Sequence, residues 1–327
     1  MPFDQIQKKS EALKLLETLL DRQEAKVRAA FMDFVRRVSS DEVIRAIADL
    51  VQRGQVTEAL AIIGYEGASL GTAANAVFLG SAQTEAEALV DQLRRLAPRA
   101  GLAFNPFDST LAAIARQTGL RFVQETTQSQ QNTILDALSR NIGGDVRQTA
   151  RAIRSAIGLT TAQQDSVRRY RNLLETGSRR AVEVALRDKR FDSSASRAAE
   201  GLALDPAKID RMVERYRQNF VAYRATVIAR TEGGHLFGVA REAGFRQMLQ
   251  QAGIAESRGE KGWRTRRDAL VRDLHEPMDG VWVGLNQVFT MPNGEVCYRP
   301  KDPSLSAKNR CSCRCLHQFS IRSDSGM

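Results

Sequence analysis

The sequence has only four cysteines, three histidines and eight prolines in 327 residues, and aromatic residues make up 6% of it. Four cysteines are too few to staple a chain of this length, which buries enough apolar surface to fold without disulfides. The scarcity of aromatic side chains argues against a surface on which the bases of single-stranded nucleic acid stack. The longest apolar stretches, at residues 59–63 and 76–79, fall far short of the roughly 20 residues that a membrane-spanning helix needs, so we expect no such segment.

The sequence also lacks the motifs of common catalytic machinery and, in residues 1–10, the apolar segment of a secretion signal. It contains no Gly-x-Ser-x-Gly elbow, no His-Glu-x-x-His motif and no phosphate-binding loop that ends in Gly-Lys. Glu85 and Glu87 form a Glu-x-Glu pair of the kind found in ADP-ribosyl transfer, but their alanine-rich helical context favours a solvated helix face. We therefore expect a protein that is not an enzyme and that is made in a bacterial-type cytoplasm.

Positive charge, by contrast, is in excess, because 48 lysines and arginines stand against 38 acidic residues and give a formal net charge of +10. An excess of this size is compatible with contact to a polyanion. It is also typical of long amphipathic helices that expose arginines to water. Charge alone does not decide between the two interpretations.

Apolar residues recur at every third or fourth position through the first two thirds of the chain, and this period predicts amphipathic helices. We expect a helix from about Thr161 to Glu175 and a helix end at Gly54. Residues able to cap a helix mark the predicted helix starts: Ser39, Ser40 or Asp41; Asp108 or Ser109; Thr160 with Gln163 or Thr161 with Gln164; and Asp205 before Pro206.

After about Gly253 the pattern changes to short β-type runs at residues 281–283, 288–290, 296–298 and 319–321. Pro292-Asn293-Gly294 predicts a turn between two of them. We therefore predict an α+β, predominantly α-helical fold, with a helical N-terminal region followed by a small C-terminal α+β domain that has a few short antiparallel strands. The expected boundaries are 1–104 for a helical N-terminal region, 105–228 for a second helical region and 229–327 for the C-terminal domain.

The run from Trp263 to Cys315 combines residue types that no helix or strand period produces. We call its distinctive positions the signature residues: Trp263, Thr265, Asp268, Arg272, His275, Asp279, Gly280, Pro300, Asp302, Pro303, Cys313, Arg314 and Cys315. Together with Ala229-Arg230-Thr231-Glu232 upstream, they resemble the C-terminal pattern of the phage Mu F-like head morphogenesis family of tailed bacteriophages. The resemblance covers about the last hundred residues. It departs at Ser312, where the family usually has an asparagine; the nearest asparagine here is Asn309.

This resemblance implies a minor head protein of a tailed bacteriophage that acts in head morphogenesis and in DNA packaging or ejection. The implied location is the virion head, at the portal vertex or in the capsid interior, after assembly in the host cytoplasm. The implied partners are the phage portal protein and other head proteins, with packaged double-stranded DNA as a further partner and multiple copies per virion. The alternative is a basic DNA-binding accessory protein of packaging or ejection, stabilised by zinc.

The cysteines and a histidine of this run supply the donor types of a structural zinc site. Cys311, Cys313 and Cys315 would share one face if they lay in a strand, about 7 Å apart in succession. Two alternatives stay open, because thiols also pair as disulfides outside a reducing host or pack as small apolar residues. The preferred ligands of one structural zinc ion are His275, Cys297, Cys313 and Cys315.

His275 has a second interpretation, which is the favoured one, since a neutral imidazole can join two loops through its two ring nitrogens. Asp279-Gly280 predicts a turn, and Asp302 lies in a loop restrained by Pro300 and Pro303. Hydrogen bonds from His275 to these loops would stabilise the small domain by about 1 kcal/mol each.

Lys261, Arg264, Arg266, Arg267 and Arg272 form the best candidate for a surface that faces packaged DNA. Such a surface would contact phosphates and would not read bases. The same arginines could instead pair with acidic residues of one helix, namely Asp268, Asp273 and Glu276.

Overall fold

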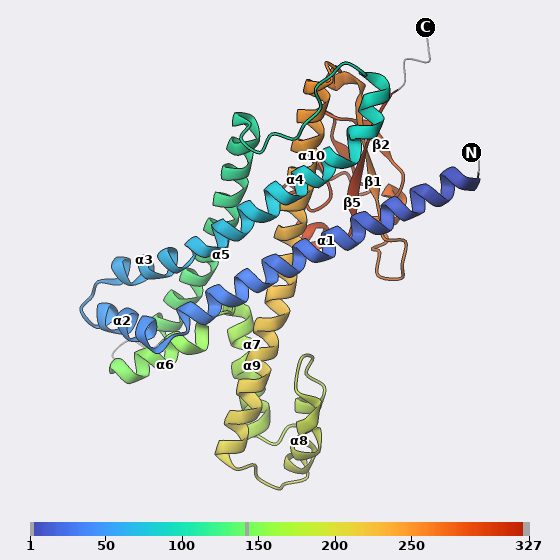
Figure 1. Ribbon diagram of the computed structural model, residues 1–327. Helices are drawn as coiled ribbons and strands as arrows, with labels where there is room; N and C mark the ends of the chain where they lie inside the picture. Colours follow the sequence, from blue (N-terminus) through green and yellow to red (C-terminus); the bar gives the residue numbers. More distant parts are fainter. Residues whose placement is uncertain (1–2, 141–143, 323–327) are drawn as a thin grey trace. The chain divides into compact units, whose positions relative to one another are not determined.

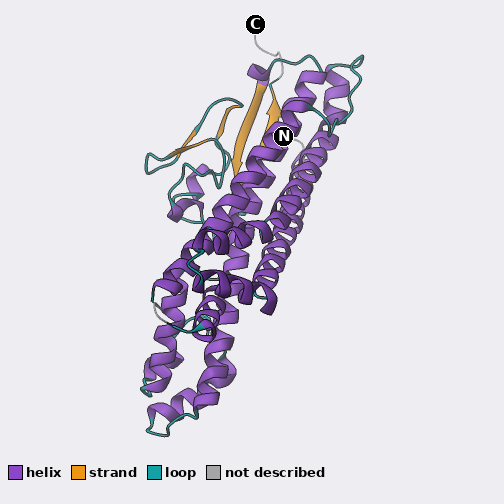
Figure 2. Cartoon of the chain, turned by 90° about the vertical axis from the view of Figure 1, so that its left-hand side faces the viewer, coloured by secondary structure: helices purple, strands orange, loops and turns teal. Residues whose placement is uncertain are grey.

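The computed structural model describes residues 3–140 and 144–322, and it describes side chains from residue 14 onward. The chain is predominantly α-helical, with a few short antiparallel strands near the C-terminus, which confirms the predicted α+β class (Figure 2). It divides into two compact units. Unit 1 comprises Met1–Ala30, Leu70–Phe122 and Val227–Met327, and unit 2 comprises Phe31–Ser69 and Val123–Thr226.

These units are interleaved in the sequence, whereas the sequence predicted three consecutive regions. The region 229–327 falls wholly within unit 1, but it packs there with residues from the first 122 positions. Such long-range packing leaves no trace in local periodicity, because the period of a helix shows which face is buried and not which partner covers it.

The regular elements of unit 2 are helical in its described residues, and two of its helices begin where the capping signals at Ser40 and Thr160 predicted. Ser40 accepts a hydrogen bond from the amide of Val43, and Thr160 forms a reciprocal capping box with Gln163. Helices α1 (Phe3–Val38) and α5 (Ser109–Ser139) contribute to both units. The other elements of unit 2 are α2 (Asp41–Gln52), α3 (Val56–Glu66), α6 (Val146–Ala156), α7 (Thr161–Glu175), η1 (Arg179–Val182), η2 (Lys189–Phe191), α8 (Asp192–Ala199) and most of α9 (Pro206–Ile228).

Unit 1 is built on two helices, α4 (Ala68–Leu96) and α10 (Gly234–Gln251), which approach each other closely at Gly244. A Cβ at Gly244 would lie 2.3 Å from the carbonyl oxygen of Ala82, so only glycine fits between the two backbones. The π-helical turn η3 (Ala229–Gly233) leads into α10. The apolar core around Phe245 and Leu89 also takes in Leu285, from a turn, and Ile321, from a strand, of the C-terminal part of the chain.

The C-terminal module, residues 259–322, carries two small antiparallel sheets. In the first, β1 (Gly259–Arg264) lies between β2 (Trp282–Gly284) and β5 (Leu316–Ile321), and β5 contacts α10 (Figure 1). In the second, β3 (Phe289–Thr290) pairs with β4 (Val296–Cys297) across the predicted turn, where Gly294 has φ +85°. The short elements η4 (Glu256–Arg258), η5 (Glu276–Met278) and α11 (Ala307–Arg310) complete the described part of this region.

The central strand β1 was not predicted, and the helix expected around the arginines near residue 266 is wrong. Residues 265–280 form turns and the single 3-10 turn η5. The sequence pattern does not predict β1, because apolar residues do not alternate along it. Its buried positions are Gly259, Lys261, Gly262 and Trp263. Gly262 is needed there, since a Cβ would lie 2.5 Å from the indole ring of Trp282 on the neighbouring strand.

Within the residues that the structure describes, no helix combines the length and the apolar character that crossing a bilayer requires.

Candidate metal centre

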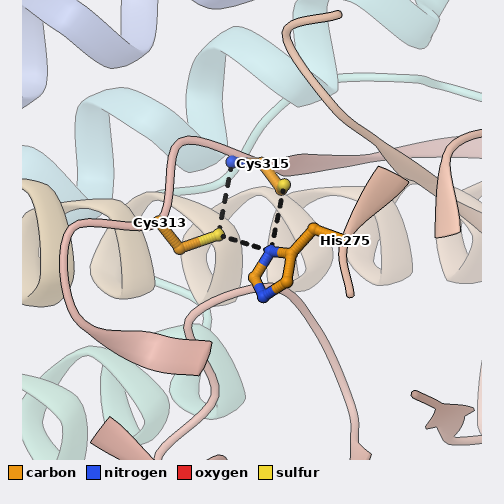
Figure 3. Close-up of side chains that lie close together, drawn as sticks. All are labelled: His275, Cys313 and Cys315. Carbon is orange, nitrogen blue, oxygen red and sulfur yellow. Dashed lines mark hydrogen bonds between the residues drawn. The ribbon is translucent and has the colours of Figure 1, made fainter. Parts of the chain in front are cut away.

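Three signature side chains, His275, Cys313 and Cys315, come together inside the C-terminal module (Figure 3). Nδ1 of His275 lies 3.5 Å from Sγ of Cys313 and 3.5 Å from Sγ of Cys315. The backbone amide of Cys315 also points at Sγ of Cys313, at 3.4 Å. The ligand atoms of the three residues all lie within 4.8 Å of one another, so one ion could contact all of them.

The two cysteines are positioned by a tight loop between α11 and β5. Ser312 adopts φ +55°, and its amide donates to Oγ1 of Thr231 at 2.9 Å. Asparagine tolerates this left-handed region better than most residues, which gives a physical reason for the asparagine that the family pattern has here. The ammonium of buried Lys301 donates to the carbonyl of Cys315 at 2.9 Å, and Arg272 donates to the carbonyls of Asn309 and Cys311. These bonds hold both sulfurs toward the imidazole.

The imidazole is held by packing. His275 is 1% exposed and precedes η5, and its ring lies edge-on to the indole of Trp263 with centroids 5.8 Å apart. Trp263, at 0% exposure, in turn packs edge-on against Phe289. The signature tryptophan therefore forms one wall of the site.

The electrostatics favour a sulfur anion. The hydrogen bond from the Cys315 thiol, the contact with His275 and the charge of Lys301 together hold the pKa of Cys313 well below its usual range, although burial opposes this. The same shared proton, with burial, raises the pKa of Cys315. Of the two thiols, Cys313 therefore loses its proton more readily, and a cation bound by both sulfurs would displace the protons that they hold.

The distances match those of a zinc centre. With Zn–S bonds of about 2.3 Å and Zn–N bonds of about 2.0 Å, a tetrahedral ion has sulfur-to-nitrogen edges of about 3.5 Å. Both measured Sγ···Nδ1 distances are 3.5 Å. Zinc also binds thiolate and imidazole donors well, whereas harder cations prefer oxygen ligands. His275, Cys313 and Cys315 therefore form a buried group that could bind a metal ion.

Cys297 does not belong to this group, in contrast to the predicted ligand set. It is buried in β4 and packs in the same apolar cluster as Trp263 and Phe289, but its sulfur is not among the atoms that lie within 4.8 Å of one another. Burial, assisted by Asp302, raises its pKa to about 12, as expected of a packed thiol. Cys311 is partly exposed, and all four cysteines are free thiols.

The second interpretation of His275, a bridge between two loops, is wrong. Nδ1 faces the sulfurs, and Nε2 has no hydrogen-bond partner among the described residues. The two loops are closed by their own bonds. Asp279 accepts from the amide of Thr265 at 2.9 Å, and Asp302 accepts from the amide and hydroxyl of Ser304 at 3.0 and 2.9 Å.

Several other signature residues contact one another, and the 229–232 motif contacts the segment before Cys311. Asp268 pairs with Arg314, and Glu232 of the motif pairs with Arg310 at 2.6 Å. Gly280 has φ +83°, and its amide donates to the carbonyl of Trp263 at 2.9 Å. Pro300 and Pro303 flank the loop that presents Lys301. The role of Lys301 was not predicted, because its basic side chain in a proline-flanked loop gives no sign of burial.

The predicted DNA-facing cluster is dispersed. Lys261 is 0% exposed, with its ammonium 5.2 Å from the ring centroid of Tyr298, so it does not reach the surface. Arg266 pairs with Asp21, and Arg264 and Arg267 share Asp279. Of these arginines Arg267 has the side chain most open to solvent, at 62%. The alternative, in which these arginines pair with Asp268, Asp273 and Glu276 of one helix, is wrong, because the segment forms turns and the arginines pair with Asp21 and Asp279.

Glu85 is buried, in contrast to the solvated face expected for Glu85 and Glu87. Its carboxylate pairs with Arg241 of α10 at 2.6 Å, and Arg241 also donates to the carbonyl of His317. Glu87 accepts from the amide group of Gln83 within the same helix. Glu85 therefore ties α4 to α10 and β5.

Comparison of the chain with family models, curated proteins and solved structures finds no match. The Mu F-like resemblance accordingly rests on the signature residues and the 229–232 motif alone.

Proposed function

We propose that this protein is a structural, non-enzymatic component of a tailed-bacteriophage head, a minor head protein of the Mu F-like type. In this role it acts in head morphogenesis and in DNA packaging or ejection, at the portal vertex or in the capsid interior, in several copies per particle. Its C-terminal module carries one zinc ion on His275, Cys313 and Cys315.

The main observation that supports this proposal is that the signature residues form contacts within the C-terminal module and stabilise it. Asp268, Arg272, Asp279 and Asp302 direct their polar atoms at neighbouring backbone or side chains. Residues of a catalytic site usually converge on a pocket that admits a substrate. In this protein the signature residues surround a buried histidine and two buried thiols, as expected of a structural module that must stay rigid.

Zinc would supply what this module cannot obtain from its own core. Its sheets consist of strands of two to six residues, and isolated short strands are marginally stable in water. A bound ion ties the turn before η5 to the loop before β5, two segments about 40 positions apart in the sequence.

Particles provide the direct test of the head assignment. Particles are purified from a lysate of the strain that encodes this chain, and its peptides are quantified by mass spectrometry against those of the portal protein. We expect more than one copy per particle, in a constant ratio to the portal protein. Absence of the chain from both precursor and mature heads would refute the assignment, and so would substrate turnover by the purified protein.

DNA binding is the second candidate function, and one surface of unit 2 favours it. Arg140, Arg151 and Arg168 line a hollow of about 710 Å³ formed by the end of α5 with α6 and α7. Arg140 and Arg168 share Asp165, whereas none of the described carboxylates pairs with Arg151. Phosphates of a DNA backbone are the ligands that such a surface fits, because the arginines give charge without a base-reading element.

We expect the full-length protein to bind duplex DNA without sequence preference, with affinity falling at least about tenfold between 50 and 200 mM salt. The Arg151→Gln variant should bind less tightly and show a salt slope smaller by about one, as for one lost phosphate contact. Arg267→Gln is the matched control, since it removes one exposed charge from the originally predicted cluster. Fluorescence anisotropy measures both. Salt-independent binding, or a loss seen only in the Arg267 variant, would rule out this surface.

A further inference from the structure

The metal centre has three protein ligands where a closed structural zinc site has four. No other histidine, cysteine or carboxylate of the described residues places a ligand atom within 4.8 Å of all three. Structural zinc sites are almost always four-coordinate with protein ligands, whereas sites with three protein ligands keep one position for solvent or another small molecule.

The two other cysteines lie outside the ligand group. Cys297 lies in β4, in register with Phe289 of β3, and its backbone is fixed by that pairing. Cys311 ends the α11 turn, and its carbonyl accepts a hydrogen bond from Arg272. Ser312, with φ +55°, then reverses the chain before Cys313. Cys297 packs in the same buried cluster as Cys313 and Cys315, but neither its sulfur nor that of Cys311 belongs to the group of ligand atoms that lie within 4.8 Å of one another.

A cavity of about 40 Å³ lies against the centre. It is lined by all three ligand residues and by Arg266, Arg272 and Arg314. This volume is close to the roughly 30 Å³ that one water molecule occupies in the liquid. The cavity is therefore large enough for a water molecule or another small ligand.

The charges around the cavity favour an anion. Two thiolates neutralise a divalent ion, so the loaded centre itself is neutral. Arg266 and Arg314 are paired with Asp21 and Asp268. Arg272 donates to two backbone carbonyls, and these leave its positive charge in place. A small anion in the cavity would gain from this guanidinium.

We propose that the ion bound by His275, Cys313 and Cys315 keeps an open fourth coordination position, which faces this cavity and holds a solvent molecule that small monovalent anions displace. The inference rests on the proposed metal site and adds the nature of its fourth ligand. It makes the centre an exchangeable ligand-binding site in addition to a structural tie.

Cobalt substitution of the full-length protein tests this. Cobalt(II) gives absorption bands that report thiolate count by charge-transfer intensity and coordination geometry by the d–d bands. We expect the charge-transfer intensity of the Cys297→Ser and Cys311→Ser variants to equal that of the wild type, because two thiolates bind in each. A third thiolate ligand would instead lower the intensity by about a third in one of these variants, and that result would overturn the proposal.

Azide supplies the second readout. Titration with azide should shift the d–d bands saturably while the charge-transfer intensity stays constant, as expected when one solvent ligand is exchanged. Unchanged d–d bands at saturating azide would show that the position is closed and would overturn the inference, although the metal site itself would stand. Failure of cobalt and zinc to bind at all would overturn the metal site, so the two failures are distinguishable.

Discussion

Full-length protein stripped of zinc is expected to unfold at a clearly lower denaturant concentration than the zinc-loaded protein. The ligand atoms of His275, Cys313 and Cys315 come together only in the folded chain, so binding energy adds to folding energy. Free zinc at a thousandfold excess over its dissociation constant would stabilise the folded state by about 4 kcal/mol. Guanidinium unfolding followed by circular dichroism, with and without a chelator, measures the difference.

Single-cysteine variants separate this effect from a general response to zinc. The Cys315→Ser variant should lose most of the zinc-dependent stabilisation, since one of three ligands is gone. Cys311→Ser should keep it, because Cys311 is partly exposed and lies outside the ligand group. Cys297→Ser should also keep the zinc dependence, although it removes a packed core thiol. If zinc stabilised the Cys315 variant as strongly as the wild type, the ligand assignment would be wrong.

Acid is the second large perturbation, and it acts through two buried histidines outside the metal centre. Burial, assisted by Arg299, lowers the pKa of His235 to about 3, and burial with Arg241 lowers the pKa of His317 well below its ordinary value. Both rings stay neutral in the folded chain, whereas in the unfolded chain they bind a proton near pH 6.5. The unfolded state thus binds more protons below pH 6.5, and stability falls as the pH falls from there toward 3.

We expect the zinc-free protein to lose about 2 kcal/mol between pH 7.5 and pH 5 through His235, and a further loss in the same direction through His317. Burial raises the pKa values of the Glu242 and Asp302 carboxyl groups, but arginine contacts and hydrogen bonds lower them by more. These two groups therefore lose their contribution to stability only below about pH 4.5. Glu24 acts in the opposite direction, because burial raises its pKa and the folded state then holds its proton more tightly.

Denaturant unfolding of zinc-free protein at the two pH values measures this loss, and zinc-free protein is needed because metal release has its own pH dependence. His235→Gln and His317→Gln keep a neutral polar side chain at each position, and each variant should reduce the pH dependence. An unchanged pH dependence in the double variant would show that other groups are responsible.

The parts of the fold that follow local rules were predictable from the sequence. Helix starts at Ser40, Thr160 and Pro206 depend on one side chain and the amides next to it, and the structure places them where the sequence predicted. Strand β1 could not be predicted in this way, because Lys261 and Gly262 are buried through contacts with β2 and β5 and with the rings of Phe289 and Tyr298. Glu85 was misjudged for the same reason, since its partner Arg241 is 156 positions away.

The buried group of His275, Cys313 and Cys315, which could bind a metal ion, was predictable in its residue types and only partly in its membership. Residue types alone selected His275, Cys313 and Cys315, because few side chains bind zinc and this sequence contains few of them. Cys297 could not be excluded from the sequence, since its place depends on the register between β3 and β4. Lys301 itself has a left-handed backbone, with φ +66°, and its side chain donates to the carbonyl of Cys315 inside the module. Neither feature is visible in the sequence.

The zinc content of full-length protein purified without chelators tests the central claim most directly. Native mass spectrometry resolves zinc-bound from zinc-free chains, and elemental analysis gives the total. We predict close to one zinc ion per chain in the wild type and in Cys311→Ser, and little in Cys313→Ser. A wild-type content below about half an ion per chain would contradict a metal centre at His275, Cys313 and Cys315.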